Sequence, residues 1–196
     1  MNSTLEKTKF TVDSDSYDFL SHVYFSEKGD IYERVSERAY LDLCRTLRLN
    51  GVDMTSHRKK ISDILRERIS ELLASSVSQN SYDHWHKAIC DELVKYFSKL
   101  DIGFTYGHAQ KWVNMTMKYL YILDEANFSD IFDFLHVPID SIVIDLAKSM
   151  LDVAKPNFLW SKIPDYDTYF AYQTKLRESI KDMSPMRWEL KAWINK

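Results

Sequence analysis

Residues 104–123, FTYGHAQKWVNMTMKYLYIL, predict a tight turn that leads into a long helix, and the prediction of the fold starts from them. Gly107 marks the turn, since glycine readily adopts the positive φ that a sharp entry to a helix can require. Trp112, Met115 and Tyr119 recur at helical spacing and predict a face that packs in the core. Lys111 falls on the first turn of this helix.

A second stretch, HVPIDSIVIDL at residues 136–146, predicts a proline-marked turn followed by another helix. Asp140 stands at the entrance of that helix, where an aspartate commonly caps the first backbone N–H groups and contributes about 1 kcal/mol. Taken singly, Asp140 is an ordinary cap and Lys111 an ordinary surface lysine.

The rest of the chain repeats this pattern of amphipathic segments separated by capping residues. Only four glycines and four prolines occur among 196 residues, which argues against a β-sandwich with its frequent turns. Helices are expected near residues 17–25, 31–49, 55–77, 81–100, 108–124, 127–135, 141–153, 165–180 and 184–194. The sequence therefore predicts an all-α fold of about eight helices.

The hydrophobic content of 45 % supports one sizeable core. We expect a flexible polar arm at residues 1–12 and a single all-α domain over residues 13–196. Two lobes are an alternative within that domain, with an N-terminal lobe at 13–100 and a hairpin and C-terminal lobe at 101–196.

Composition argues against several classes of function. The net charge of −3 counts mildly against a dedicated nucleic-acid binder. Two cysteines provide neither a disulfide framework nor the ligands of a zinc ribbon. His84 and His86 point about 200° apart on a helix, so they do not predict a metal site. Without an apolar leader or a membrane-spanning run, we expect a cytoplasmic protein with no membrane partner, no metal and no cofactor.

The two opening stretches together resemble a known family. Residues 107–111, GHAQK, are similar to the hairpin of helix-hairpin-helix DNA glycosylases, in which a glycine-rich turn carries a lysine into a helix. Residues 137–141, VPIDS, resemble the proline-valine-aspartate signature that follows in that superfamily. The archaeal oxidised-guanine glycosylases look closest, and the resemblance covers residues 104–148, about a quarter of the chain.

The resemblance implies that Lys111 is the nucleophile of a glycosylase and lyase, that Asp140 is its catalytic carboxylate, and that damaged DNA is the partner. Free backbone N–H groups at the helix start would hold DNA phosphates, together with nearby side chains. These phosphate-binding candidates are Gly107, His108, Ala109, Gln110 and Lys118. A flipped base would need aromatic neighbours, for which the C-terminal region offers Trp160, Tyr166 and Tyr169.

Two other classes of function fit the same sequence. The first is a non-catalytic helical module that binds nucleic acid or a nucleotide through Gly107, Lys111 and the basic helix starts. The second is a helical protein-interaction domain, for which the helix with Trp188 and Trp193 would supply the contact surface. The sequence does not set the oligomeric state.

Overall fold

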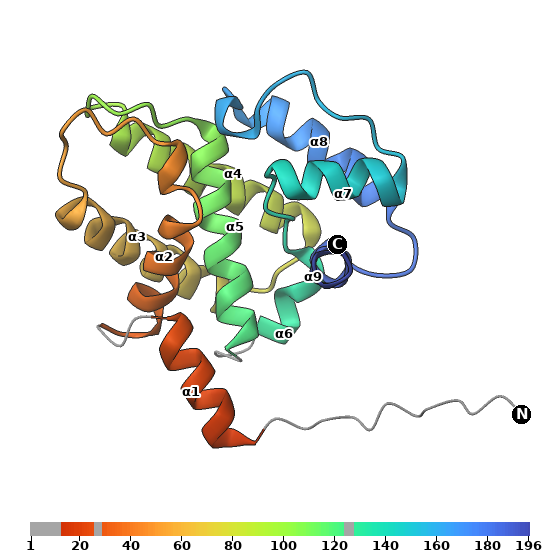
Figure 1. The fold of residues 1–196 in the computed structure, drawn as a ribbon, viewed down its shortest axis with the longest axis horizontal. Helices are drawn as coiled ribbons and strands as arrows, with labels where there is room; N and C mark the ends of the chain where they lie inside the picture. The colour runs from red at the N-terminus through yellow and green to blue at the C-terminus, as the bar shows by residue number, and fades with distance from the viewer. Residues whose placement is uncertain (1–12, 26–28, 124–127) are drawn as a thin grey trace, which may run out of the picture.

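The computed structural model describes residues 13–25, 29–123 and 128–196, and within these ranges all regular secondary structure is helical, with no strand. The all-α prediction is therefore confirmed. The helices are α1 (Ser14–Tyr24), α2 (Ile31–Leu41), α3 (Thr55–Leu73), α4 (Gln79–Phe97), α5 (Tyr106–Ile122), α6 (Phe128–Ile131), α7 (Ser141–Leu151), α8 (Tyr166–Ser179) and α9 (Pro185–Ile194) (Figure 1). The 3-10 turns are η1 (Cys44–Thr46), η2 (Phe132–Phe134) and η3 (Trp160–Lys162).

Helix α5 is the central element of the fold. Fourteen of its 17 residues are buried, so it is packed on both its apolar and its polar faces. Figure 1 shows α5 in the middle of the molecule, with α2 and α3 on one side and α7, α8 and α9 on the other. One cluster of buried apolar side chains extends from Phe25 to Ala192, so helices from both halves of the sequence share a core. The long helix predicted from residues 104–123 is therefore the central helix of the fold.

The start of α5 is capped differently from the expectation. The cap is Thr105, whose hydroxyl accepts the His108 N–H, and Gly107 lies inside the helix. The prediction of a positive φ at Gly107 is wrong, because among the described glycines only Gly29 and Gly51 have positive φ. Instead, Gly107 permits close packing, since a Cβ placed there would lie 1.9 Å from the Trp160 carbonyl oxygen of η3. Glycine is needed here for space.

The helix expected over residues 31–49 is too long. Helix α2 ends at Leu41, and after a turn the chain continues as η1. The Asp42 carboxylate accepts hydrogen bonds from Arg38, one turn back, and from Tyr119 of α5, which fixes the chain at this turn. The contact with Tyr119 is tertiary, and it overrides the helical periodicity of the sequence.

Helix α1 packs differently from the others, because none of its residues is buried. Figure 1 shows it extending from the body of the molecule below α2 and α5. The expected arm at residues 1–12 lies outside the described residues. No helix in the described ranges has both the length and the apolar character needed to cross a membrane.

Candidate functional site

Lys111 and Asp140 meet in the folded chain. The Lys111 Nζ lies 2.7 Å from Asp140 Oδ2, although the residues are 29 positions apart. Their side chains are 8 % and 13 % exposed, so the pair is largely removed from water but still open on one side. Removing one partner of such a pair typically costs about 3–5 kcal/mol, because the other charge stays buried without compensation.

Helix α7 and a clamped loop fix the position of Asp140. Its second carboxylate oxygen accepts the Val143 N–H at 2.9 Å and caps α7, as the sequence predicted. Just before it, the Gln110 side chain accepts the Ile139 N–H at 3.0 Å and donates to the Ile139 carbonyl at 2.8 Å. One glutamine of α5 thereby satisfies both backbone groups of the residue that precedes Asp140.

A second glutamine repeats this arrangement two residues earlier. The Gln173 side chain, from α8, accepts the Val137 N–H at 3.3 Å and donates to the Val137 carbonyl. Pro138, between the two clamped residues, has no N–H to satisfy. The two amide side chains therefore act as a neighbouring strand would. They hold the loop against α5 and α8, and the loop places Asp140 opposite Lys111.

The other side of Lys111 faces η3. Its ammonium lies 4.8 Å from the centre of the Trp160 ring, a cation–π distance. η3 approaches α5 closely because Gly107 has no side chain, and the Gly107 N–H donates to the Ile163 carbonyl at 3.2 Å. The ammonium is therefore held between a carboxylate and an indole.

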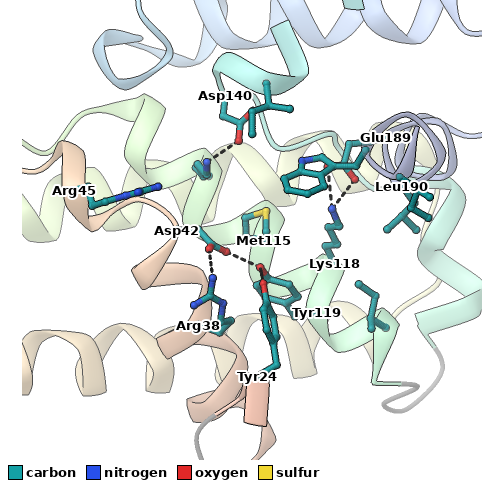
Figure 2. Close-up of a pocket in the computed structure, with 15 residues that line it drawn as sticks. Tyr24, Arg38, Asp42, Arg45, Met115, Lys118, Tyr119, Asp140, Glu189 and Leu190 are labelled. Atoms are coloured by element: carbon teal, nitrogen blue, oxygen red, sulfur yellow. Dashed lines mark hydrogen bonds and ion pairs between the residues drawn. The ribbon is translucent and has the colours of Figure 1, made fainter. Parts of the chain in front are cut away.

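The pair forms part of the wall of a cavity of about 510 Å³, which lies among α1, α2, α5, α7 and α9. Lys118 also lines this cavity, as expected from its position two helical turns after Lys111. Apart from Arg45, the charged groups on its wall form three separate clusters, shown by the dashed lines in Figure 2. A cavity of this volume is within the range of small-molecule sites.

The first of the other clusters joins α1, α2 and α5. The Tyr119 hydroxyl donates to Asp42 at 2.6 Å and lies 3.0 Å from the Tyr24 hydroxyl. Arg38 donates to the other Asp42 oxygen at 2.7 Å and stacks over the Tyr24 ring. Burial, followed by the Asp42 charge, raises the pKa of Tyr119 above its usual range, so this hydroxyl stays protonated and donates.

The second cluster is an ion pair between α5 and α9. The Lys118 Nζ contacts both Glu189 oxygens, at 2.8 and 2.7 Å, and the two side chains are 9 % and 1 % exposed. Burial raises the pKa of Glu189, and the positive charge of Lys118 opposes that rise. Lys118 was predicted to contact phosphate, but in this structure its charge is already compensated inside the protein.

The backbone N–H groups that were expected to bind phosphate at the start of α5 already donate hydrogen bonds within the protein. The His108 N–H donates to the Thr105 carbonyl at 3.1 Å and lies 3.4 Å from its hydroxyl oxygen, and the Ala109 N–H donates to the same carbonyl at 3.1 Å. Gln110 is buried inside α5. The expectation of unpaired N–H groups at this helix start is therefore wrong for these positions, because Thr105 caps the helix and η3 covers it.

His108 has a structural environment. Its Nδ1 accepts the Thr105 N–H at 3.0 Å, which leaves Nε2 to donate to the Thr46 hydroxyl at 3.1 Å. Burial, followed by the nearby charge of Lys162, lowers the pKa of His108 to about 4. The imidazole is neutral at pH 7 and links η1 to α5.

None of the three aromatic residues expected around a flipped base lines the cavity. Tyr169 is fully buried, and its hydroxyl hydrogen-bonds to Asn114 and His136 in the core. Tyr166 stacks on Phe170, with ring centres 5.0 Å apart. Trp160 lies against Lys111 but is not one of the residues that line the cavity.

The aromatic side chains that do line the cavity are Tyr24, Tyr119 and Trp193, and sequence reasoning did not assign them there. Trp193 carried a sequence signal, since the last helix was expected to present it at a surface. It is 41 % exposed. The position of Tyr24 depends on how α1 meets α5, which no local pattern encodes.

No cluster of three or more histidine, cysteine, aspartate or glutamate side chains in the described ranges has a metal-binding arrangement. His86 is buried and bonds to Asn114, whereas His84 is exposed and bonds to the Asn80 carbonyl.

Comparisons of the chain with protein-family models, with curated proteins and with solved structures found no match.

Proposed function

We propose that this chain is a DNA glycosylase and lyase that removes a damaged base through Lys111. The observation that carries the proposal is the 2.7 Å contact between Lys111 Nζ and Asp140 Oδ2 on the wall of a cavity. An amine nucleophile needs a nearby base that can take its proton, and Asp140 is within hydrogen-bond reach.

The chemistry follows from this contact. Asp140 takes a proton from the Lys111 ammonium, and the neutral amine attacks C1′ of the damaged nucleotide. The bond from C1′ to the base breaks, and the base leaves with the bonding electron pair and receives the proton from Asp140. One of the two protons on Nζ then moves to the ring oxygen, and the bond from C1′ to that oxygen breaks and opens the sugar ring. The other proton stays on Nζ, so a protonated Schiff base joins Nζ to C1′. The carboxylate also stabilises positive charge that develops on the sugar.

The test is reductive trapping with borohydride, using duplex DNA that contains an abasic site or an oxidised guanine. Wild-type protein should form a covalent adduct, and Lys111→Gln should form none. Asp140→Asn is the matched variant, because asparagine caps a helix about as well as aspartate but carries no charge. We expect its trapping rate to fall by about 10²-fold or more, in the range of general acid–base effects.

Circular dichroism of each variant checks that it is folded. A wild-type protein that gives no adduct on either substrate refutes the proposal, as does an adduct that persists in Lys111→Gln.

The second candidate is a non-catalytic nucleic-acid or nucleotide-binding module. It is favoured by the fact that Lys111 is already held on both sides, by Asp140 and by the Trp160 ring, as a structural ion pair would be. Binding of DNA without adduct formation or strand cleavage is the outcome that selects this function.

A further inference from the structure

Two arginines, Arg45 on the cavity wall and Arg48 just after η1, differ from the other arginines in the described ranges. In the described ranges, Arg38, Arg58, Arg66, Arg68 and Arg177 pair with carboxylates, and Arg187 bonds to the Tyr121 hydroxyl. Arg45 and Arg48, in and after η1, are exposed and have no ion pair or side-chain hydrogen bond there. A guanidinium left without a partner by its own chain is suited to bind an external anion.

Arg45 is the one cation on the described cavity wall that has no carboxylate partner. Asp140 compensates Lys111, Glu189 compensates Lys118, and Asp42 compensates Arg38. No acidic side chain on the wall remains for Arg45. Figure 2 shows its guanidinium directed toward the cavity, between the Asp140 pair and the Asp42 cluster, without a dashed line.

A third cation, Lys162 of η3, lies near the same part of α5 as Arg45, because η1 and η3 both contact the start of that helix. Thr46, next to Arg45, bonds to His108 of α5 at 3.1 Å. Lys162, the last residue of η3, is exposed, and its charge acts on the same histidine. The Arg48 carbonyl accepts the Gly103 N–H at 3.3 Å, which holds Arg48 beside the loop that enters α5.

We propose that Arg45, Arg48 and Lys162, here called the cationic rim, bind the phosphate backbone of duplex DNA beside the Lys111 cavity. This inference rests on the proposed function, and it assigns the phosphate contacts to side chains of η1 and η3. The helix-start N–H groups do not serve that purpose, because Thr105 and the Ile163 carbonyl already accept from them. A rim of unpaired cations also explains how a chain with a net charge of −3 would hold a polyanion.

The test measures binding of a fluorescent, undamaged duplex by anisotropy over a series of salt concentrations. The rim variant is Arg45→Gln/Arg48→Gln/Lys162→Gln. The matched control is Lys95→Gln/Lys175→Gln/Lys181→Gln, which removes the same charge from exposed lysines of α4, of α8 and of the turn after α8 that have no ion pair in the described chain. Each lost phosphate contact lowers the slope of log affinity against log salt by about 0.9, so the rim variant should lose up to about 2.7 in slope.

We expect the rim variant to bind at least about tenfold more weakly at low salt, and the control variant to bind like the wild type. Equal losses in both variants, or no loss in the rim variant, overturn the proposal. Tighter binding of single-stranded RNA than of duplex DNA overturns the choice of partner.

Borohydride trapping with the wild-type protein separates the two proposals. Rim-dependent DNA binding without any adduct leaves the rim standing and refutes the glycosylase. An adduct that forms while DNA affinity is independent of the rim supports the enzyme and refutes the rim.

Discussion

Replacing Gly107 by alanine should destabilise the protein, although the same change inside most helices is stabilising. Alanine has a higher helix propensity than glycine by about 1 kcal/mol, which would favour the variant. Here the added Cβ would stand 1.9 Å from the Trp160 carbonyl oxygen and 3.0 Å from its carbonyl carbon. Both atoms belong to the backbone, so no side-chain rotation relieves the overlap.

The size of the effect follows from what must move. To restore ordinary contact, η3 must shift by more than about 1 Å, which strains the bonds from Thr105 to the Ser161 carbonyl and from Gly107 to the Ile163 carbonyl. Overpacking of this kind costs about 1–3 kcal/mol and occasionally more. Because the overlapped atoms belong to the backbone, we place Gly107→Ala at the upper end of this range, about 3 kcal/mol. After the propensity gain of about 1 kcal/mol is subtracted, we expect a net loss of about 2 kcal/mol. For a chain of this length that corresponds to a fall in Tm of about 4–8 °C.

Chemical denaturation and thermal melting of Gly107→Ala measure this loss. Gly103→Ala is the matched control, because a Cβ there meets only the Arg48 Cβ at 3.9 Å, and φ is not positive. Its stability should stay within about 0.5 kcal/mol of the wild type. If Gly107→Ala is as stable as Gly103→Ala, the close approach of η3 to α5 is wrong, and with it the support of Lys111 by Trp160.

Three further predictions concern buried polar groups. Glu189→Gln should lower the free energy of unfolding by about 3 kcal/mol, because Lys118 is left buried without a counter-charge. Asp91→Asn, which breaks the exposed pair with Lys87, should lower it by less than about 1 kcal/mol. Equal losses of the two variants in urea titrations would contradict the burial argument. Gln110→Leu should lower the free energy of unfolding by about 3 kcal/mol, since both backbone groups of Ile139 lose their partner. It should also slow borohydride trapping at saturating DNA, because Asp140 is displaced. A variant that is destabilised but still folded, with Asp140 in place, would not show this slower trapping. Burial lowers the pKa of His108 in the folded protein to about 4, so the unfolded chain binds the proton first as the pH falls. The contribution of neutral His108 to the free energy of unfolding should therefore be complete above pH about 6.5 and should decline toward pH about 4, by up to about 1.4 kcal/mol per pH unit. Between pH 7 and pH 5, the free energy of unfolding should change less in His108→Asn than in the wild type, whereas the exposed control His84→Asn should behave like the wild type. An equal change in His108→Asn and the wild type would refute the role of neutral His108.

Local sequence patterns were enough to predict the helical class and most helix positions. Helix spacing of apolar residues is a local property, and caps such as Asp13, Asp140 and Asp165 act on N–H groups three residues away. For the same reason, the local pattern alone was enough to place Asp140 at the entrance of α7. The pairing of Lys111 with Asp140 in one site was expected from the proposed resemblance of their two stretches to one family, and that resemblance stays a prediction.

The contacts of those residues could not be predicted from local patterns, because they depend on how distant helices pack. A positive φ at Gly107 and free N–H groups after it were reasonable local expectations. They were wrong because η3, more than 50 positions along the chain, packs on this helix start and Thr105 caps it. The distance from Lys111 to Asp140, the pairing of Lys118 with Glu189, and the lack of a partner for Arg45 all depend on which helices lie side by side. Helix periodicity fixes which face of a helix is buried, but the packing of distant elements decides which charge on that face is compensated and which remains free to bind.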